Sequence, residues 1–150
     1  MATNLLSLTG FKLKFNTDLF PLTEKLAVAA TFPSISVSEV AINFANKAGF
    51  VSSGFLEYGE LSVRIAVDEK LAVYEELFSW LKVNSEGGGI VAYSMVLNFL
   101  TSHYNVSRSI RFNSVFATAI SGIELNTQAT DVEYGYVDVT FKYDNFVFQD

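Results

Sequence analysis

Leu61-Ser-Val-Arg-Ile-Ala-Val67, followed directly by Asp68-Glu-Lys-Leu-Ala-Val-Tyr74, changes from a strand pattern to a helix pattern within a few residues. In the first part every second residue is apolar, which is typical of a β-strand with one buried face. From Leu71 to Leu81 apolar residues recur at intervals of three and four, and Asp is a residue type that caps helices. The stretch therefore predicts a strand followed by a helix from about Asp68 to Lys82.

The predicted helix has one apolar stripe that we expect to pack against a sheet. The stripe consists of Leu71, Tyr74, Leu77, Phe78 and Leu81. Val73 and Trp80 lie off this stripe and could make a second contact.

Strand patterns dominate the rest of the chain. Phe11-Lys-Leu-Lys-Phe15 alternates apolar and basic residues and predicts a first strand. Further strands are predicted over residues 25–32, 35–44, 90–101, 109–117 and 132–148. The apolar residues change phase near Ser38 and before Gly135, which predicts a bulge or a sheet corner at each place. The glycine-punctuated segment from Asn46 to Gly59 predicts a long loop or a protruding hairpin arm.

Length and composition predict a single mainly β domain that spans residues 1–150. The chain is 50% hydrophobic and 15% aromatic, and it contains no cysteine. A chain of this length can bury one core, and aromatic residues favour pleated, half-buried surfaces. We expect an antiparallel β-sandwich or barrel with one flanking α-helix and an extended hairpin arm.

The high proportion of apolar residues is not explained by a membrane-spanning segment. The longest uninterrupted apolar stretch is Leu26–Ala30, whereas a spanning helix needs about 20 apolar residues. We expect the surplus to be buried between strands or between subunits, with no membrane insertion by this chain. The first ten residues lack the basic and apolar regions of a secretory signal, so we expect the protein to fold in a cytoplasm.

Residues that commonly carry catalysis are scarce. His103 is the only histidine and cysteine is absent, which excludes a metal site built from several such ligands. Gly49 and Gly54 have the spacing of a phosphate-binding loop, but Phe55 and Leu56 stand where that motif needs Lys and Ser or Thr. We predict no enzyme, no catalytic residues, no cofactor and no metal.

The net charge of −6 argues against stable nucleic-acid binding. Binding to a phosphate backbone depends on Lys and Arg, which displace counterions. Transient passage of DNA past the protein stays compatible with this charge.

Five segments together resemble the tail tube protein family of contractile-tailed bacteriophages. They are Phe11-Lys-Leu-Lys-Phe15, Ala29-Ala-Thr-Phe-Pro33, Leu61 to Trp80 with Val67-Asp-Glu-Lys-Leu-Ala-Val-Tyr-Glu-Glu-Leu-Phe-Ser-Trp80 inside it, Phe116-Ala-Thr-Ala-Ile-Ser-Gly-Ile-Glu-Leu125 and Val137-Asp-Val-Thr-Phe-Lys-Tyr143. The likeness is one of pattern and covers nearly the whole chain. Ala119, after Thr118, stands where the family's turn would have a proline.

The resemblance implies a structural subunit of a tail tube. Such subunits form hexameric rings that stack into a hollow tube through which DNA passes when the genome is ejected. Strands of six subunits line the lumen, the helix lies outside toward the sheath, and the arm and termini contact the next ring. The implied partners are further copies of the chain, the tail sheath protein, and baseplate and tail terminator proteins. The implied location is the tail of the virion, assembled in the host cytoplasm.

Two groups of site residues follow from the resemblance. The arm would run from Asn46 to Tyr58. Its apolar anchors, together with apolar residues near the two termini, are interface candidates: Phe50, Val51, Phe55, Leu5, Leu6, Leu8, Phe146 and Phe148. Asp138 and Asp144 are candidates to face the lumen, where carboxylates would repel DNA phosphate.

Three other functions stay open. The chain could be a baseplate ring that initiates the tube, or the tube protein of a contractile injection or secretion system. More distantly, a closed barrel could bind a small apolar ligand. Rings or tubes in electron micrographs would separate the first two from the third.

Overall fold

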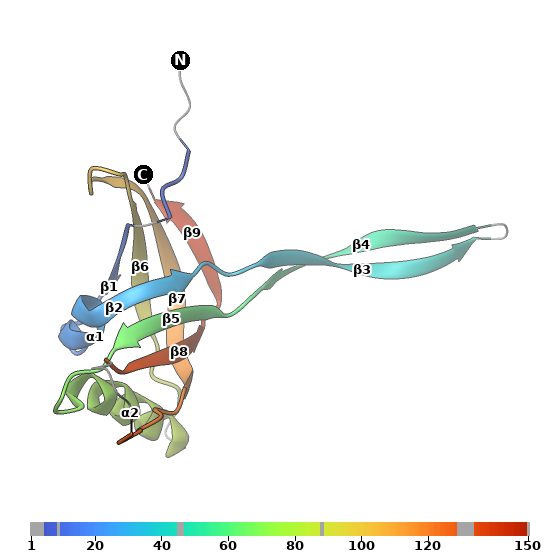
Figure 1. Ribbon diagram of the computed structural model, residues 1–150. Helices are drawn as coiled ribbons and strands as arrows, with labels where there is room; N and C mark the ends of the chain where they lie inside the picture. Colours follow the sequence, from blue (N-terminus) through green and yellow to red (C-terminus); the bar gives the residue numbers. More distant parts are fainter. Residues whose placement is uncertain (1–4, 9, 45–46, 88, 129–133, 150) are drawn as a thin grey trace.

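The computed structural model describes residues 5–8, 10–44, 47–87, 89–128 and 134–149. The elements in chain order are β1 (Phe11–Phe15), α1 (Pro21–Leu26), β2 (Ala27–Thr31), β3 (Ile35–Phe44), β4 (Lys47–Tyr58), β5 (Leu61–Ala66), α2 (Ala72–Ser85), β6 (Tyr93–Leu100), β7 (Val106–Ile120), β8 (Tyr136–Lys142) and β9 (Asn145–Gln149). The predicted fold class is confirmed, because antiparallel strands form the body and a helix flanks them (Figure 1).

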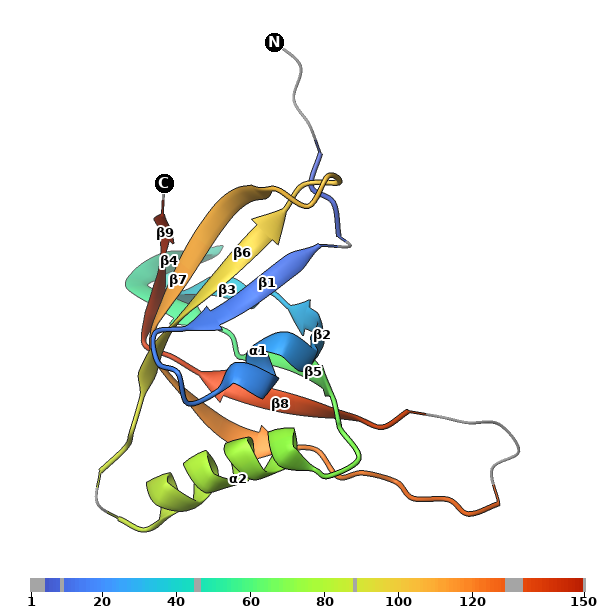
Figure 2. The ribbon, with the colours of Figure 1, turned by 90° about the vertical axis from the view of Figure 1, so that its left-hand side faces the viewer.

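The body is one seven-stranded sheet folded over on itself. Its strand order is β1-β6-β7-β8-β5-β2, and β9 pairs with β7 off this path. The N-terminal part of β7 pairs with β6 and β9, whereas its C-terminal part pairs with β8. We call β1, β6, β9 and the first part of β7 the upper half-sheet, and β8, β5, β2 and the rest of β7 the lower half-sheet. Figure 2 shows the two halves one above the other.

A bulge in β7 makes the corner between the half-sheets. Tyr93 pairs with Val115 and Met95 pairs with Phe112, so Asn113 and Ser114 together face one residue of β6. Ser114 has a φ of 57°, in the left-handed region. Such a bulge bends the strand and increases its twist. The long strand can therefore belong to both half-sheets.

The core lies between the half-sheets and is rich in aromatic rings. Phe112 of the upper half and Phe141 of the lower half are both fully buried. Helix α2 covers one open side of this core and buries Val73, Leu77 and Trp80. The predicted stripe was therefore wrong in part, because Leu71 and Phe78 are about half exposed while Val73 and Trp80 are buried.

Helix α2 begins at Ala72, four residues later than predicted. Leu71 has a φ of 56°, which breaks the helical path between Asp68 and Ala72. Asp68 still caps the helix, because its Oδ1 accepts a hydrogen bond of 3.2 Å from the Val73 amide. Desolvation alone would raise the pKa of Asp68, but hydrogen bonds from the backbone amides of Val73 and Ala72 outweigh it and lower that pKa.

The sequence pattern does not predict helix α1, and the strand predicted over residues 25–32 overlaps the last two residues of this helix. Pro21 stands in the first turn of α1, where its missing amide costs no hydrogen bond. Thr23 is fully buried, and its hydroxyl donates a hydrogen bond of 3.1 Å to the carboxylate of Glu76 on α2. This bond ties the two helices together over the core.

Other strand predictions need smaller corrections. The predicted strand over residues 132–148 is two strands, β8 and β9, which turn at Tyr143 and Asp144 and pair with different parts of β7. The bulge predicted near Ser38 is confirmed by a register shift between Val37 and Glu39. The bulge predicted before Gly135 involves Val132, which lies outside the described residues, so it stays a prediction.

The arm is a two-stranded hairpin that projects far from the body (Figure 1). It consists of β3 and β4, which pair only with each other in a sheet of their own. The arm therefore starts at Ile35 rather than at Asn46. The strand pattern over 35–44 was correct, but it belongs to the arm and not to the body.

Candidate assembly surfaces

The root of the arm is fixed by hydrogen bonds to the backbone of Gly59. The Gly59 amide donates a bond of 2.8 Å to the Ser34 carbonyl, and the Tyr143 hydroxyl donates one of 2.8 Å to the Gly59 carbonyl. Burial of the phenol and the neighbouring Tyr58 raise the pKa of Tyr143 to about 12. These bonds fix the direction in which the arm leaves the body.

The arm presents apolar side chains that the body does not cover. Phe55 is 71% exposed, and Ile35, Val37 and Leu56 are about half exposed. Phe50 and Val51 lie in β4 opposite Ala41 and Val40, but their side chains are outside what the structure describes. A strand of twelve residues is about 40 Å long at 3.3 Å per residue, so the arm reaches well beyond its own body.

The apolar residues near the termini lie in different surroundings. Leu5, Leu6 and Leu8 are 92%, 60% and 89% exposed. Phe148 is also exposed, with the Arg108 guanidinium 5.2 Å from its ring centre. Phe146, in contrast, corrects the prediction of an exposed interface residue. Its side chain is buried against Phe112 and other core rings, because β9 turns it inward.

The two acids proposed for the lumen lie apart in the structure. Asp138 is on the outward face of the lower half-sheet, where its carboxylate is 3.5 Å from the Nε of Arg64. On the same sheet Lys142 is 3.7 Å from the carboxylate of Glu60. Asp144 lies beyond the end of β8, in the turn to β9, so it does not share the strand face of Asp138. Asp138 and Glu60 are thus each close to a basic side chain.

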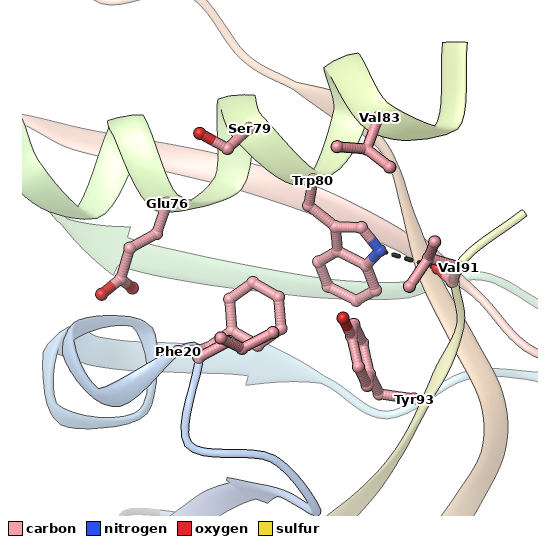
Figure 3. Close-up of a pocket in the computed structure, with 8 residues that line it drawn as sticks. Phe20, Glu76, Ser79, Trp80, Val83, Val91 and Tyr93 are labelled. Atoms are coloured by element: carbon pink, nitrogen blue, oxygen red, sulfur yellow. Dashed lines mark hydrogen bonds between the residues drawn. The ribbon is translucent and has the colours of Figure 1, made fainter. Parts of the chain in front are cut away.

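An apolar cleft lies beside α2, and the sequence analysis did not predict it (Figure 3). Its volume is about 360 Å³, and it is lined by Leu19, Phe20, Glu76, Ser79, Trp80, Val83, Val91 and Tyr93. The ring centres of Phe20 and Trp80 are 4.7 Å apart, and those of Trp80 and Tyr93 are 5.4 Å apart. In the sequence, the one signal for this cleft is that Trp80 lies off the apolar stripe predicted to pack against the sheet.

The described part of the chain contains neither a metal-binding cluster nor a membrane-spanning helix. Among those residues no group of three or more His, Cys, Asp or Glu side chains is placed to hold a metal ion. The described helices are too short or too polar to cross a membrane.

No protein-family model matches the sequence, and no curated protein matches it either. Solved structures do resemble the fold. A chain from the sheath–tube complex of PVC, an extracellular contractile injection system, matches with a TM-score of 0.73 at 12% identity, over 97% of this chain and 91% of that one. A chain from the tube-terminating cap of the anti-feeding prophage gives 0.73 at 12% identity, over 99% and 93%. An Hcp protein gives 0.57 at 12% identity, over 93% and 90%.

Proposed function

We propose that this chain, whose fold is that of tube components of contractile injection systems, is itself a structural tube subunit. Six copies would form a ring, and rings would stack into a hollow tube. The likeness in fold over the whole chain supports this reading. Sheath, baseplate and terminator proteins would be its partners, since solved structures of such complexes contain chains of this fold.

The projecting arm is the observation that carries the proposal. A two-stranded ribbon alone is at best marginally stable in water. This one pairs only with itself and exposes Phe55, Leu56 and Val37. Exposed apolar surface of this kind marks a contact with another molecule. A neighbouring copy at the distance of the arm would supply the missing surface.

Two settings remain for such a tube, a phage tail that passes DNA and an injection machine that passes another cargo. We infer the second setting, because solved structures that share this fold come from an extracellular contractile injection system and a type six secretion system.

A baseplate ring that initiates the tube shares the same fold requirement and remains a second candidate. The small-ligand barrel is less well supported. The interior where a ligand would bind is filled by core side chains, among them Phe112, Phe141 and Met95, all fully buried.

Electron microscopy of the purified protein tests the proposal. We expect six-fold rings or hollow tubes, and native mass spectrometry should give the mass of six chains. A variant in which residues 38–55 are replaced by a short glycine turn should keep the thermal unfolding of the body and lose ring formation. A monomer at every concentration tested would contradict the proposal.

A further inference from the structure

Two apolar surfaces lie at opposite ends of the molecule. The described N-terminal segment, residues 5–8, lies at the end remote from α2 in both views (Figures 1 and 2). Leu5 and Leu8 on it are almost fully exposed. The cleft between Phe20, Trp80 and Tyr93 opens at the α2 end (Figure 3). One end therefore presents exposed apolar side chains, and the other end presents the apolar cleft.

The size of the cleft suits this use. An apolar cavity of about 150 Å³ is enough to hold a benzene molecule. At about 360 Å³, the cleft has room for two aliphatic side chains. Its polar groups are Glu76, Ser79 and the hydroxyl of Tyr93, which points toward Trp80 in Figure 3, and aromatic rings form most of its floor.

The upper half-sheet, which lies toward the end that carries residues 5–8, and the α2 segment also differ in charge (Figure 2). The outward face of the upper half-sheet carries Lys12, Lys14 and Arg111, and the described strand residues of this face include no carboxylate. The segment 68–86, which contains α2, has five carboxylates and two lysines. Attraction between a basic end and an acidic end favours contact of unlike ends and disfavours contact of like ends.

We infer that the leucine-bearing segment of one copy inserts Leu5 and Leu8 into the cleft beside Trp80 of a copy in the next ring. This rests on the proposed function, because it describes how rings of that tube stack. Because the contact joins two different surfaces, the last ring of a stack always has one of them free. Further rings can therefore add without closing the assembly. The occupant of the cleft is thus a second copy of this chain.

Disulfide cross-linking tests the contact directly, because the chain has no cysteine of its own. We would combine Leu8→Cys with Ser79→Cys, two exposed positions, and oxidise assembled protein. A bond forms only when the two Cβ atoms come within about 4.5 Å. The double variant should give a ladder of linked chains on a non-reducing gel. A mixture of the two single variants should stop at linked pairs.

The matched control is Leu8→Cys combined with Phe78→Cys. Phe78 is exposed on the same helix but does not line the cleft. This pair should give no ladder. Equal ladders from both double variants, or none from Leu8→Cys with Ser79→Cys in protein that forms tubes, would overturn the inference. If no rings form in unmodified protein, the proposed function itself fails.

A second pair of variants measures stacking without cross-linking. Leu5→Ser combined with Leu8→Ser, and separately Val83→Glu, alter exposed residues on the two sides of the contact. Each should leave six-fold rings intact and abolish their stacking into tubes. Tubes of normal length from both variants would contradict the insertion.

Discussion

The indole Nε1 of Trp80 donates a hydrogen bond of 2.8 Å to the carbonyl oxygen of Val91, which ties α2 to the segment leading into β6. Asn84 strengthens this tie, because its Oδ1 accepts a bond of 2.7 Å from the Val91 amide. The position of α2, and with it one wall of the cleft, depends on these contacts.

Two substitutions of Trp80 should destabilise the body to different degrees. Trp80→Phe keeps an aromatic ring but loses the bond to Val91, and should lower the free energy of unfolding by about 1–2 kcal/mol. Trp80→Ala also leaves a cavity, and should cost about 3–5 kcal/mol. Urea unfolding measures both. Phe78→Ala, on the exposed side of α2, should cost less than either, and an equal loss would contradict the role of Trp80.

Tyr143 should make stability fall at high pH. Its pKa is raised from 10.0 to about 12 in the folded protein, so the neutral phenol is favoured there. The stabilisation is complete below pH 10 and is lost as the pH rises through 12, because the unfolded chain releases the proton first. Urea titrations between pH 9 and 12 should show a smaller decline in Tyr143→Phe than in the unmodified protein. Equal declines would contradict this assignment.

Asp68 should have the opposite dependence, at low pH. Its folded pKa lies below the ordinary value of 3.8, so its stabilisation is present above pH 3.8 and is lost as the pH falls through the folded pKa. We expect Asp68→Asn to be less stable than the unmodified protein at pH 7, and the difference to shrink below pH 3.8. A difference independent of pH would show that the carboxylate does not act through its charge.

Ser114→Gly should stabilise the protein. Ser114 is in the left-handed region, with a φ of 57°, where glycine lacks the steric penalty of a Cβ. The gain should be about 1 kcal/mol by urea unfolding, whereas Ser114→Val should destabilise because β-branched residues resist this conformation. A stabilising valine would show that the bulge can be removed without cost.

Gly59→Ala should disturb assembly more than folding. A Cβ at this position would lie 2.8 Å from the Ser34 Oγ and 3.0 Å from the Ser34 carbonyl oxygen, which forces the root of the arm to move. We expect rings to be lost or irregular in electron micrographs. Gly54→Ala, where a Cβ meets open space, reports the effect of a methyl group without a contact at the root, although its φ of 84° adds strain of its own.

The strand and turn patterns predicted the architecture of the body well, but not the face of the helix that packs. Two apolar stripes overlap in the sequence of α2 and the residue before it, one through Leu71 and Phe78 and one through Val73 and Trp80. The sequence favoured the first because it contains more apolar residues. The structure buries the second, since Trp80 finds a hydrogen-bond partner in Val91 and aromatic neighbours in Phe20 and Tyr93.

The exposure of the interface candidates could be predicted only in part. Leu5, Leu8 and Phe55 are exposed, as an interface role requires. Phe146 is buried because β9 crosses back onto β7, a pairing between segments far apart in sequence that periodicity does not indicate. The cleft was not predicted either, since it forms where α2, the loop before α1 and the start of β6 meet.

The sharing of β7 between the two half-sheets has a consequence for how the body responds to force and denaturant. Because β7 pairs with β6 and β9 in one half-sheet and with β8 in the other, one half cannot separate unless β7 also loses hydrogen bonds to its partners. The body should therefore melt in a single cooperative transition rather than one layer at a time. In such a subunit, a mechanical force on one half-sheet passes to the other through the continuous backbone of β7.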